Sequence, residues 1–246
     1  MTIVKGLSAL NLLSDEGQET SSFENKFSHL KSGDSRIVRV LSLEDVVAVP
    51  TYSIFKKVNT FKPKDEPVLT AKDYPKSNLT PFDKAWKYHN DLSEKFGDEH
   101  SQEAYKYRVK RRFAIGFYDL DEKKCIVIDF SKNQAIEIFD FLTKNEKKLD
   151  KKAFELSKTG SGTQTKVSLN ILDVDDSDLT EAQVEAFNNA PKEFDDTLFE
   201  KLYFELDNDQ MVAKLKEIGF DLSLIGLGEN KRTQTVSDVA EEDFGF

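Results

Sequence analysis

Residues 105–118 combine cations and aromatic rings at a regular spacing. With the two-residue period of a β-strand, one side would carry four cations, which are Lys106, Arg108, Lys110 and Arg112. The opposite side would carry apolar and aromatic side chains: Tyr105, Tyr107, Val109, Phe113, Ile115 and Phe117. Arg111 interrupts the alternation. Because like charges roughly 7 Å apart repel each other, this basic ladder predicts a bound anion such as a nucleic-acid backbone.

A second group of aromatic and basic residues precedes the ladder: Tyr52, Phe55, Lys56, Lys57, Trp86 and Tyr88. Single-stranded nucleic acid is held by a cationic groove with aromatic rings on which bases stack, each stacked base contributing roughly 1–3 kcal/mol. The two groups together therefore predict an interface for single strands. Two other interpretations stay open. Either the rings belong to the core while the cations only solvate the surface, or the ladder binds an acidic protein.

The net charge of −10 is divided unevenly along the 246 residues. Residues 167–246 hold 6 Lys and Arg against 20 Asp and Glu, whereas residues 1–166 hold 29 against 25. The first part can face polyanions. The acidic part is repelled by them unless it folds back on the basic surface.

The composition is that of a globular protein, with 38% hydrophobic and 33% charged residues. We expect no membrane segment, because no apolar run approaches the ~20 residues that a bilayer span requires. The N-terminus shows no pattern of an export signal. Cys125 is the single cysteine, which excludes an intramolecular disulfide and a Cys-rich zinc site and suits a reducing cytoplasm.

The domain organisation follows from changes of pattern. Residues 1–24 are expected to be an N-terminal arm, and residues 25–175 a core with an insertion at 57–104 that is punctuated by prolines. The core has strand patterns at 36–41 and 46–55, and the insertion has a helix pattern at 81–96.

The second half of the core gives the clearest local signals. The basic strand turns at 119–123 and returns at 124–130, which predicts a hairpin; a helix then begins near Ser131, and a strand pair follows at 154–156 and 166–172. Residues 176–227 are expected to form a helical extension. Its two helices start at the capping boxes Thr180-x-x-Gln183 and Asp207-x-x-Gln210, and the second ends at Gly219.

This list of elements predicts a mainly β fold with helical additions, of the α+β class. The architecture that fits best is an OB-fold-like five-stranded barrel with an insertion subdomain, because the OB-fold is a five-stranded barrel that binds oligonucleotides. Fold alone does not give function.

The order of motifs resembles the T-even phage single-stranded-DNA-binding (helix-destabilising) proteins over residues 23–172. It comprises Phe27-x-x-Leu30-Lys31-Ser32-Gly33 before the first strand, an aromatic second strand, an insertion, and the basic hairpin that leads to the helix at 130–142. The resemblance implies sequence-independent binding of single-stranded DNA in replication, recombination and repair of a phage genome. It also implies the host-cell cytoplasm, and that the aromatic and basic residues named above line the cleft.

Two departures from that family change the expectations. Its members hold the insertion with a zinc ion on cysteines and a histidine, whereas this insertion has His89 and His100 and no cysteine. We therefore expect no metal and no cofactor, with Trp86, Tyr88 and Phe96 holding the insertion together. The family's basic arm drives self-association, but this arm has only Lys5 as a cation. Self-association remains possible.

The last residues form an acidic tail that ends in phenylalanine, with these candidate contacts: Asp238, Glu241, Glu242, Asp243, Phe244 and Phe246. Residues 228–246 lack periodicity and are expected to be disordered. The tail is similar to those of bacterial single-stranded-DNA-binding proteins. It could dock replication or recombination proteins through a basic pocket, or serve only as a solubilising end.

The sequence offers little for catalysis, so we expect no enzyme. The segment Gly160-Ser161-Gly162-Thr163 lacks the Gly-Lys-Ser/Thr ending of a phosphate-binding loop and predicts a hairpin turn. A run of carboxylates precedes a predicted helix, where a solvated cluster is the better interpretation: Asp173, Asp175, Asp176 and Asp178.

Overall fold

The computed structural model describes residues 27–174 and 178–228. Within these residues the chain divides into two compact units. Of the described residues, unit 1 comprises 27–49, 111–174 and 178–204, and unit 2 comprises 50–110 and 205–228. The sequence-based division treated 57–104 as an insertion and 176–227 as a separate extension. The structure groups residues 205–228 with the inserted segment.

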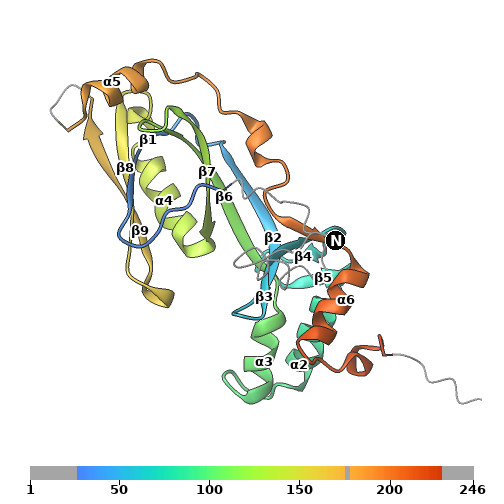
Figure 1. The fold of residues 1–246 in the computed structure, drawn as a ribbon. Helices are drawn as coiled ribbons and strands as arrows, with labels where there is room; N and C mark the ends of the chain where they lie inside the picture. The colour runs from blue at the N-terminus through green and yellow to red at the C-terminus, as the bar shows by residue number, and fades with distance from the viewer. Residues whose placement is uncertain (1–26, 175–177, 229–246) are drawn as a thin grey trace, which may run out of the picture. The chain divides into compact units, whose positions relative to one another are not determined.

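The strands form one large sheet and one small one (Figure 1). The large sheet has eight strands in the order β10-β3-β2-β6-β1-β8-β9, with β7 paired to β6, and β4 and β5 form a separate pair. The strands are β1 (Ser35–Arg39), β2 (Val46–Ile54), β3 (Val58–Pro63), β4 (Val68–Leu69), β5 (Pro75–Ser77), β6 (Lys110–Asp119), β7 (Lys124–Ser131), β8 (Lys152–Thr159), β9 (Lys166–Asp173) and β10 (Phe204–Leu206).

The mixed α+β class is confirmed, whereas a closed five-stranded barrel is not what the strand pairings give. The large sheet has eight strands, and the path of pairings among the described residues runs from β10 to β9 without closing. The three strands beyond β1, β6, β7, β8 and β9 are β2, β3 and β10, which lie wholly or partly in unit 2. Strand β2 continues through Pro50, where the sequence predicted an interruption.

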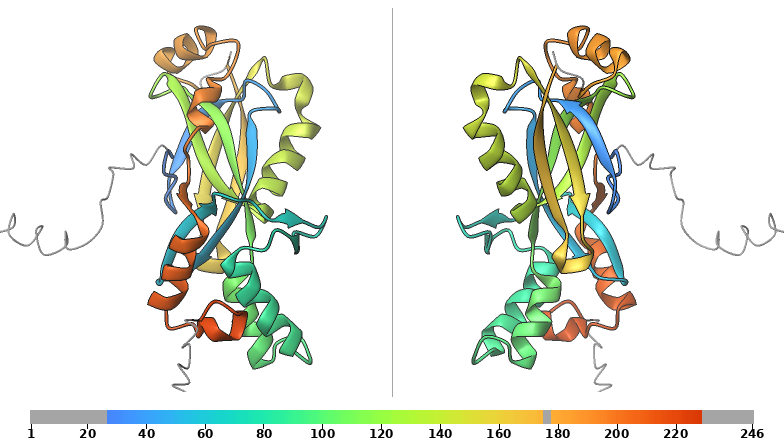
Figure 2. Two further views of the ribbon diagram at one scale, coloured as in Figure 1. Left: turned by 90° about the vertical axis from the view of Figure 1, so that its right-hand side faces the viewer. Right: turned by 90° about the vertical axis from the view of Figure 1, so that its left-hand side faces the viewer.

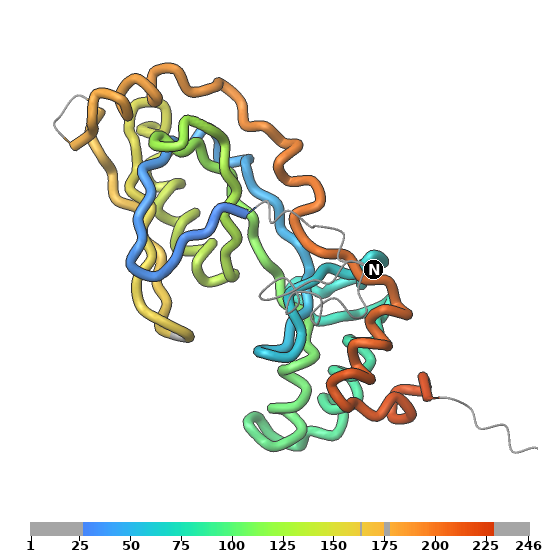
Figure 3. Tube along the Cα trace, viewed as in Figure 1, coloured from blue at the N-terminus to red at the C-terminus, as the bar shows by residue number. Residues whose placement is uncertain are grey.

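The predicted hairpin is confirmed as β6 and β7, which pair in register from Arg112 with Ser131 to Asp119 with Lys124. Lys123 closes the turn with a φ of 51°. The predicted strand pair is also present as β8 and β9, which run side by side over their whole length (Figure 3).

The core of unit 1 forms between its strands and helix α4 (Lys132–Lys144). The helix buries Ala135, Ile138 and Leu142, which lie three and four residues apart and so share one face. It contacts β7 and β9. Unit 1 also contains α5 (Glu181–Asn188) and three short 3₁₀ turns, η1 (Glu146–Lys148), η2 (Gly162–Gln164) and η3 (Asp196–Phe199).

Unit 2 has its own core and its own helices, which are α2 (Pro81–Leu92), α3 (Glu99–Tyr107), α6 (Asn208–Glu217) and the 3₁₀ turn η4 (Leu222–Ile225). Figure 2 shows α2 and α3 as a helical pair joined by a short turn. Helix α2 also contacts α6 and η4. Both capping boxes predicted for the C-terminal helices are present, and Gly219 ends α6 with a φ of 84°, a conformation that glycine adopts without strain.

A buried polar network fixes the start of α2. The Tyr52 hydroxyl donates to Asp83 Oδ1 at 2.8 Å, and the Thr80 backbone N–H donates to Asp83 Oδ2 at 3.0 Å. Burial raises the pKa of Asp83. The network closes a capping box inside the core and joins β2 to α2.

The prediction of one continuous basic strand over residues 105–118 is wrong. Asp98 accepts a hydrogen bond from the Ser101 N–H at 2.7 Å and caps α3, which then runs to Tyr107. Lys106 therefore lies on a helix, Arg108 caps its C-terminus, and the strand begins only at Lys110. The four cations do not share one strand face.

Candidate nucleic-acid interface

Of the four cations predicted to alternate along one strand, Arg108 and Lys110 do lie on extended chain with one residue between them. Arg108 has an extended backbone, and Lys110 opens β6. Val109 between them is buried in the core of unit 2. Because side chains alternate along an extended chain, Arg108 and Lys110 project to the side opposite Val109 and away from that core.

Arg108 lies over an aromatic ring that the sequence analysis did not select. Its Cζ is 4.5 Å from the centroid of the Tyr74 ring, and the Tyr74 ring stacks on Trp86 with centroids 5.9 Å apart at 30°. The Arg108 Nη2 also donates to the Lys72 carbonyl at 3.4 Å. A cation within about 6 Å of a ring centroid is attracted by the ring's negative face and stays charged.

The turn before β5 holds Tyr74 in place. The Tyr74 N–H donates to the Thr70 hydroxyl at 3.1 Å, and the Thr70 N–H donates to the Tyr74 carbonyl at 2.8 Å. Asp73 takes a φ of 60° inside this turn. The signal that could have found Tyr74 is the sequence Asp73-Tyr74-Pro75, a turn composition that carries an aromatic residue.

Tyr105 and Lys110 form a second cation and ring pair. The Lys110 Nζ is 5.1 Å from the centroid of the Tyr105 ring, and Tyr105 on α3 is 63% exposed. The neighbouring Lys106 is instead paired with the Glu103 carboxylate on the same helix. Of the two adjacent residues, Tyr105 offers an exposed ring, whereas Lys106 has its charge compensated.

The turn between β2 and β3 carries a third pair. Phe55 is 86% exposed, and the Lys56 Nζ is 5.3 Å from its ring centroid. The turn is tight: Ile54 pairs with Val58, and the Lys57 N–H donates to the Ile54 carbonyl at 2.9 Å. Lys56 takes a φ of 59°, and Lys57 is exposed. This turn therefore presents one ring and two cations.

We call these residues of unit 2 the aromatic–cation set: Phe55, Lys56, Lys57, Tyr74, Trp86, Tyr105, Arg108 and Lys110. Exposed rings can stack on bases, and the cations beside them can approach phosphates. Neither interaction reads the hydrogen-bonding edge of a base, so the set is suited to binding without sequence preference.

Two of the predicted stacking residues are not available for this role. Tyr52 is fully buried, packs on Phe61 with ring centroids 5.6 Å apart, and donates a hydrogen bond from its hydroxyl to Asp83. Tyr107 is buried as well, in edge contact with Phe220 at 5.2 Å. Both are core residues of unit 2, because the β2 and α3 faces that carry them pack inward.

Arg112 has an anion inside unit 1. Its Nε and Nη2 donate to the two oxygens of Asp129 at 2.9 and 2.6 Å, and the Tyr203 hydroxyl donates to the same carboxylate at 2.7 Å. Burial alone would lower the pKa of Arg112, but the bonded carboxylate outweighs it and the pKa is raised. Arg112 therefore has a carboxylate partner within unit 1 that the predicted ladder did not include. Arg111 begins the unit 1 portion of β6 and is partly exposed.

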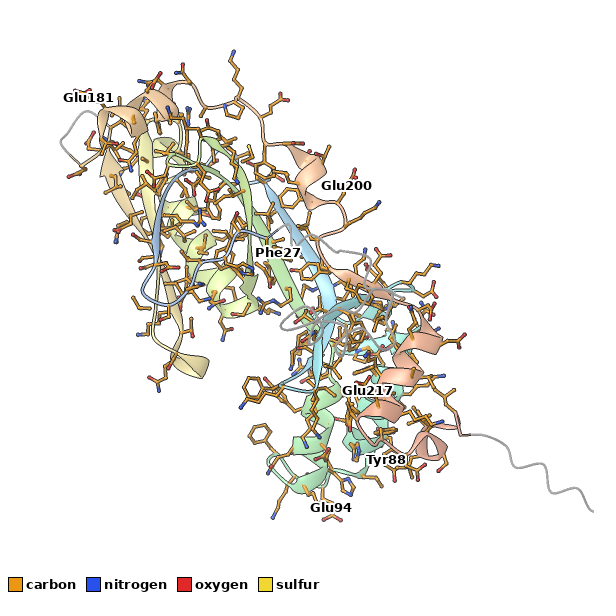
Figure 4. All side chains as sticks on the ribbon, in the orientation of Figure 1. Phe27, Tyr88, Glu94, Glu181, Glu200 and Glu217 are labelled. Carbon is orange, nitrogen blue, oxygen red and sulfur yellow. The ribbon has the colours of Figure 1, made fainter. Side chains whose placement is uncertain are left out.

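The histidines of the inserted segment contact each other. His89 Nδ1 and His100 Nδ1 are 3.2 Å apart, and the His89 ring stacks on Tyr107 at 5.9 Å and meets Tyr88 edge-on at 5.2 Å. Tyr88, labelled in Figure 4, is partly exposed on α2. Burial lowers the pKa of His89. Among residues 27–174 and 178–228, no group of three or more His, Cys, Asp or Glu is placed to hold a metal ion.

Phe96 does not hold the inserted segment together. Its exposed fraction is 103%, so the ring contacts solvent on every side, and the predicted helix ends earlier, at Leu92. Trp86 and Tyr88 do contribute packing, through Tyr74 and His89 respectively.

The remaining predicted features fall outside the interface. The Gly160–Thr163 segment is part of the connection between β8 and β9, with Gly160 at a φ of 79°. Asp173 is ion-paired with Lys152 across the same two strands. The acidic tail from 229 onward, the arm at 1–24, Asp175 and Asp176 lie outside the described residues.

No protein family, curated protein or solved structure matches the chain. A search of the described helices for one with the length and apolarity needed to cross a bilayer finds none.

Proposed function

We propose that the protein binds single-stranded DNA without sequence preference, and that it acts in replication, recombination and repair of a phage genome by protecting single strands rather than by catalysis. The observation that carries this proposal is the aromatic–cation set of unit 2. Three cations there lie over aromatic rings, and two of these rings, Phe55 and Tyr105, are largely exposed.

Exposed aromatic rings beside cations are better explained by binding than by folding. An exposed phenylalanine at a β-turn contributes little to folding, and water solvates a lysine without help from a ring. A single strand uses both, because its unpaired bases offer apolar faces and its phosphates offer charge at regular spacing. An acidic protein partner, the alternative from the sequence, would use the cations and leave the exposed rings without a role.

We also infer that unit 1 is a variant of the OB-fold. Its five strands β1, β6, β7, β8 and β9 are joined by antiparallel pairings of β1 with β6 and β8, of β6 with β7, and of β8 with β9. Helix α4 lies between the third and the fourth of these strands in chain order. The OB-fold is a five-stranded, partly open Greek-key barrel, so an arrangement in which β7 and β9 are not paired remains compatible with it.

Competitive titration of the full chain tests the proposed function. We expect fluorescent oligo(dT) to bind more tightly than duplex DNA or polyglutamate, and binding to weaken as salt rises. The Arg108→Gln/Lys110→Gln double variant should bind every single-stranded sequence less tightly. Its matched control is Lys147→Gln/Lys148→Gln, which removes two exposed cations from η1 of unit 1.

Two outcomes would contradict the proposal. Polyglutamate binding as tightly as oligo(dT) would favour the acidic-protein alternative, since polyglutamate has charge but no bases. An equal loss of affinity for oligo(dT) in the double variant and in its control would mean that binding depends on the net charge of the protein and not on the aromatic–cation set. An arm with oligo(U) of the same length measures the preference for DNA over RNA.

We also propose that the acidic C-terminal tail binds replication or recombination proteins. Its carboxylates and terminal phenylalanines have the chemistry of a peptide that docks in a basic apolar pocket. Deleting residues 238–246 should abolish recruitment of such a partner to the DNA-bound protein. It should also tighten binding to oligo(dT) at low salt, where an acidic segment competes best with phosphates. Unchanged recruitment would leave the tail a solubilising end.

A further inference from the structure

The turn between β4 and β5 brings a further cation next to Arg108. This turn comprises residues 70–74, and Lys72 within it is exposed. The backbone carbonyl of Lys72 accepts the hydrogen bond from Arg108 Nη2 at 3.4 Å. The Lys72 ammonium group is therefore tethered within about one lysine side chain's length of the Arg108 guanidinium. Asp73, the next residue along the turn, is buried.

The rest of unit 2 fixes the place of this turn. Strands β4 and β5 form a separate sheet of two strands (Figure 2), and such a pair is marginally stable in water by itself. Leu69 of β4 packs against the core of unit 2, and Tyr74 stacks on Trp86 of α2. Arg108 therefore meets a turn that is anchored on α2.

The Tyr74 ring is better placed to support Arg108 than to stack on a base. It is 39% exposed, compared with 86% for Phe55 and 63% for Tyr105. Two neighbours already contact the Tyr74 ring, since Arg108 Cζ lies 4.5 Å from its centroid and the Trp86 centroid lies 5.9 Å away. A cation held over a ring keeps its charge, and a side chain that is already ordered loses little entropy on binding.

Both cations are available to an anion. Neither Arg108 nor Lys72 forms an ion pair with any residue that the structure describes. The bond from Arg108 to the Lys72 carbonyl is long and has a neutral acceptor, whereas hydrogen bonds between ions are shorter and roughly twice as strong. A phosphate oxygen can therefore replace the carbonyl, and the Arg108 guanidinium has further N–H donors for the same phosphate.

We propose that Arg108 and Lys72 form a phosphate-binding subsite, in which Tyr74 is a positioning residue that orients Arg108 through its own stack on Trp86. The ligand is the phosphodiester backbone of a single strand. The inference rests on the proposed function and deepens it. It assigns Lys72 to the interface, and it gives Tyr74 a role different from that of Phe55 and Tyr105, whose rings are open to bases.

The salt dependence of oligo(dT) binding by the full chain tests the role of Tyr74. Tyr74→Ala removes no cation, but it leaves the Arg108 guanidinium without its ring. The slope of log affinity against log salt should therefore flatten by about 0.7, the value for one phosphate contact on a single strand. Phe55→Ala is the matched control, because the loss of a stacking ring should weaken binding and leave the slope unchanged.

Two further substitutions separate orientation from folding. Tyr74→Leu keeps apolar packing against Trp86 but has no ring face, so it should flatten the slope as Tyr74→Ala does. Tyr74→Phe keeps the ring and should restore the parent slope. Thermal melts show which variants fold. A parent-like slope in folded Tyr74→Leu protein would overturn the positioning role, and so would unfolding of both the alanine and the leucine variants, which would make Tyr74 a folding residue.

A double-mutant cycle shows whether Tyr74 acts through Arg108. Tyr74→Ala and Arg108→Gln should each weaken oligo(dT) binding about tenfold, the effect of one charge-assisted contact. The protein with both changes should bind no more weakly than Arg108→Gln alone. Losses that multiply to about a hundredfold would mean that Tyr74 contacts the strand independently of Arg108, and they would overturn the positioning role.

Lys72→Gln tests the second cation of the subsite. It should flatten the salt slope by about 0.7 in the parent protein and by the same further amount in Arg108→Gln, because each cation makes its own phosphate contact. The matched control is Lys95→Gln, which removes an exposed lysine from the turn between α2 and α3 of the same unit and should leave the slope unchanged. A parent-like slope for Lys72→Gln, or equal changes in the two variants, would overturn the assignment of Lys72.

The same titrations distinguish failure of the subsite from failure of the proposed function. A parent protein that does not bind oligo(dT) would overturn both. Weaker binding by Phe55→Ala and by Arg108→Gln/Lys110→Gln, with parent-like affinity and slope for Tyr74→Ala and Lys72→Gln, would overturn the subsite alone.

Discussion

The two units use the same cationic residue types with different partners. In unit 1, Arg36 bonds to Asp119 at 2.5 Å and to Glu122 at 2.7 Å, and Arg112 bonds to Asp129 at 2.6 Å. In unit 2, Arg108, Lys110 and Lys56 lie over the rings of Tyr74, Tyr105 and Phe55. Carboxylates therefore meet Arg36 and Arg112 of unit 1, and aromatic rings meet three cations of unit 2.

The partner of a cation decides whether its charge can still bind an anion. A carboxylate neutralises the cation and ties two strands together, so the pair contributes to folding and is not available to a phosphate. A ring orients the cation without neutralising it, so the charge can still meet an anion. The contrast holds for these residues and not for every cation. Arg39 of unit 1 lies over the Phe187 ring at 4.3 Å, and Lys62 and Lys106 of unit 2 are paired with Glu205 and Glu103.

The largest expected effect is on the stability of unit 1. Asp129→Asn should lower the free energy of unfolding by about 2 kcal/mol, because it leaves the Arg112 guanidinium and the Tyr203 hydroxyl around a neutral amide. Chemical denaturation measures this change. Asp91→Asn is the control: it breaks the exposed pair with Lys87, whose removal should cost about 0.5 kcal/mol or less. Retained stability with lost DNA binding would place Arg112 in the interface and end the contrast.

The next effect is on stacking in unit 2. Tyr105→Ala and Phe55→Ala should each weaken binding of oligo(dT) by about 1–2 kcal/mol with little change in stability, since both rings are exposed. Tyr105→Phe keeps the ring and should bind like the parent. Fluorescence titration at fixed salt provides the comparison, and a Tyr105→Phe protein as weak as Tyr105→Ala would show that the hydroxyl, not the ring, makes the contact.

A smaller effect concerns salt. Arg108→Gln and Lys110→Gln should each flatten the slope of log affinity against log salt by about 0.7, the value for one phosphate contact on a single strand. Arg112→Gln should leave the slope unchanged in protein that remains folded, because its charge is already compensated. A slope change of equal size in all three variants would show that Arg112 contacts phosphate despite its ion pair with Asp129.

The smallest effect is the pH dependence of unit 2. Because burial raises the pKa of Asp83 in the folded state, ionising this carboxyl opposes folding. Its contribution is most favourable below the unfolded pKa of about 3.9 and is lost as pH rises through the folded pKa. The stability of the parent protein relative to Asp83→Asn should therefore increase as pH falls through that window. Thermal melts of both proteins at matched pH test the sign, and the reverse trend would mean that Tyr52 and Thr80 stabilise the ionised form.

The predictable parts of the fold depend on local interactions. The hairpin of β6 and β7 follows from two alternating runs around a short turn, and α5 and α6 begin at capping boxes that the sequence shows directly. In the candidate site, Phe55, Lys56, Lys57 and Tyr105 were selected from the sequence and are exposed. Turn and helix C-terminal positions such as these are exposed unless a distant segment covers them.

The residues whose roles were predicted wrongly or missed have partners in distant segments of the chain. Tyr52 was selected as a stacking residue, but its hydroxyl meets Asp83, which lies 31 residues away. Arg112 was predicted to belong to a ladder of cations, but it bonds to Asp129, which lies 17 residues later on the other strand of the hairpin. Tyr203, a further 74 residues along the chain, bonds to the same carboxylate. Tyr74 was missed because only its contact with Arg108, 34 residues later, gives it a role.

The sequence by itself determined the hairpin, the capped helices and the concentration of cations and rings near residue 108, because each depends on neighbours within one turn or one strand. It could not choose between helix and strand for residues 105–107, since their alternation with the residues that follow fits a strand, whereas the helix that contains them begins at an Asp98 cap. The tertiary structure made that choice, and it gave Arg112 its carboxylate and Arg108 its ring. The physical reason is that a charge is compensated by whatever lies within a few ångströms in space, and the contacts that decided Arg108 and Arg112 join segments far apart in the chain.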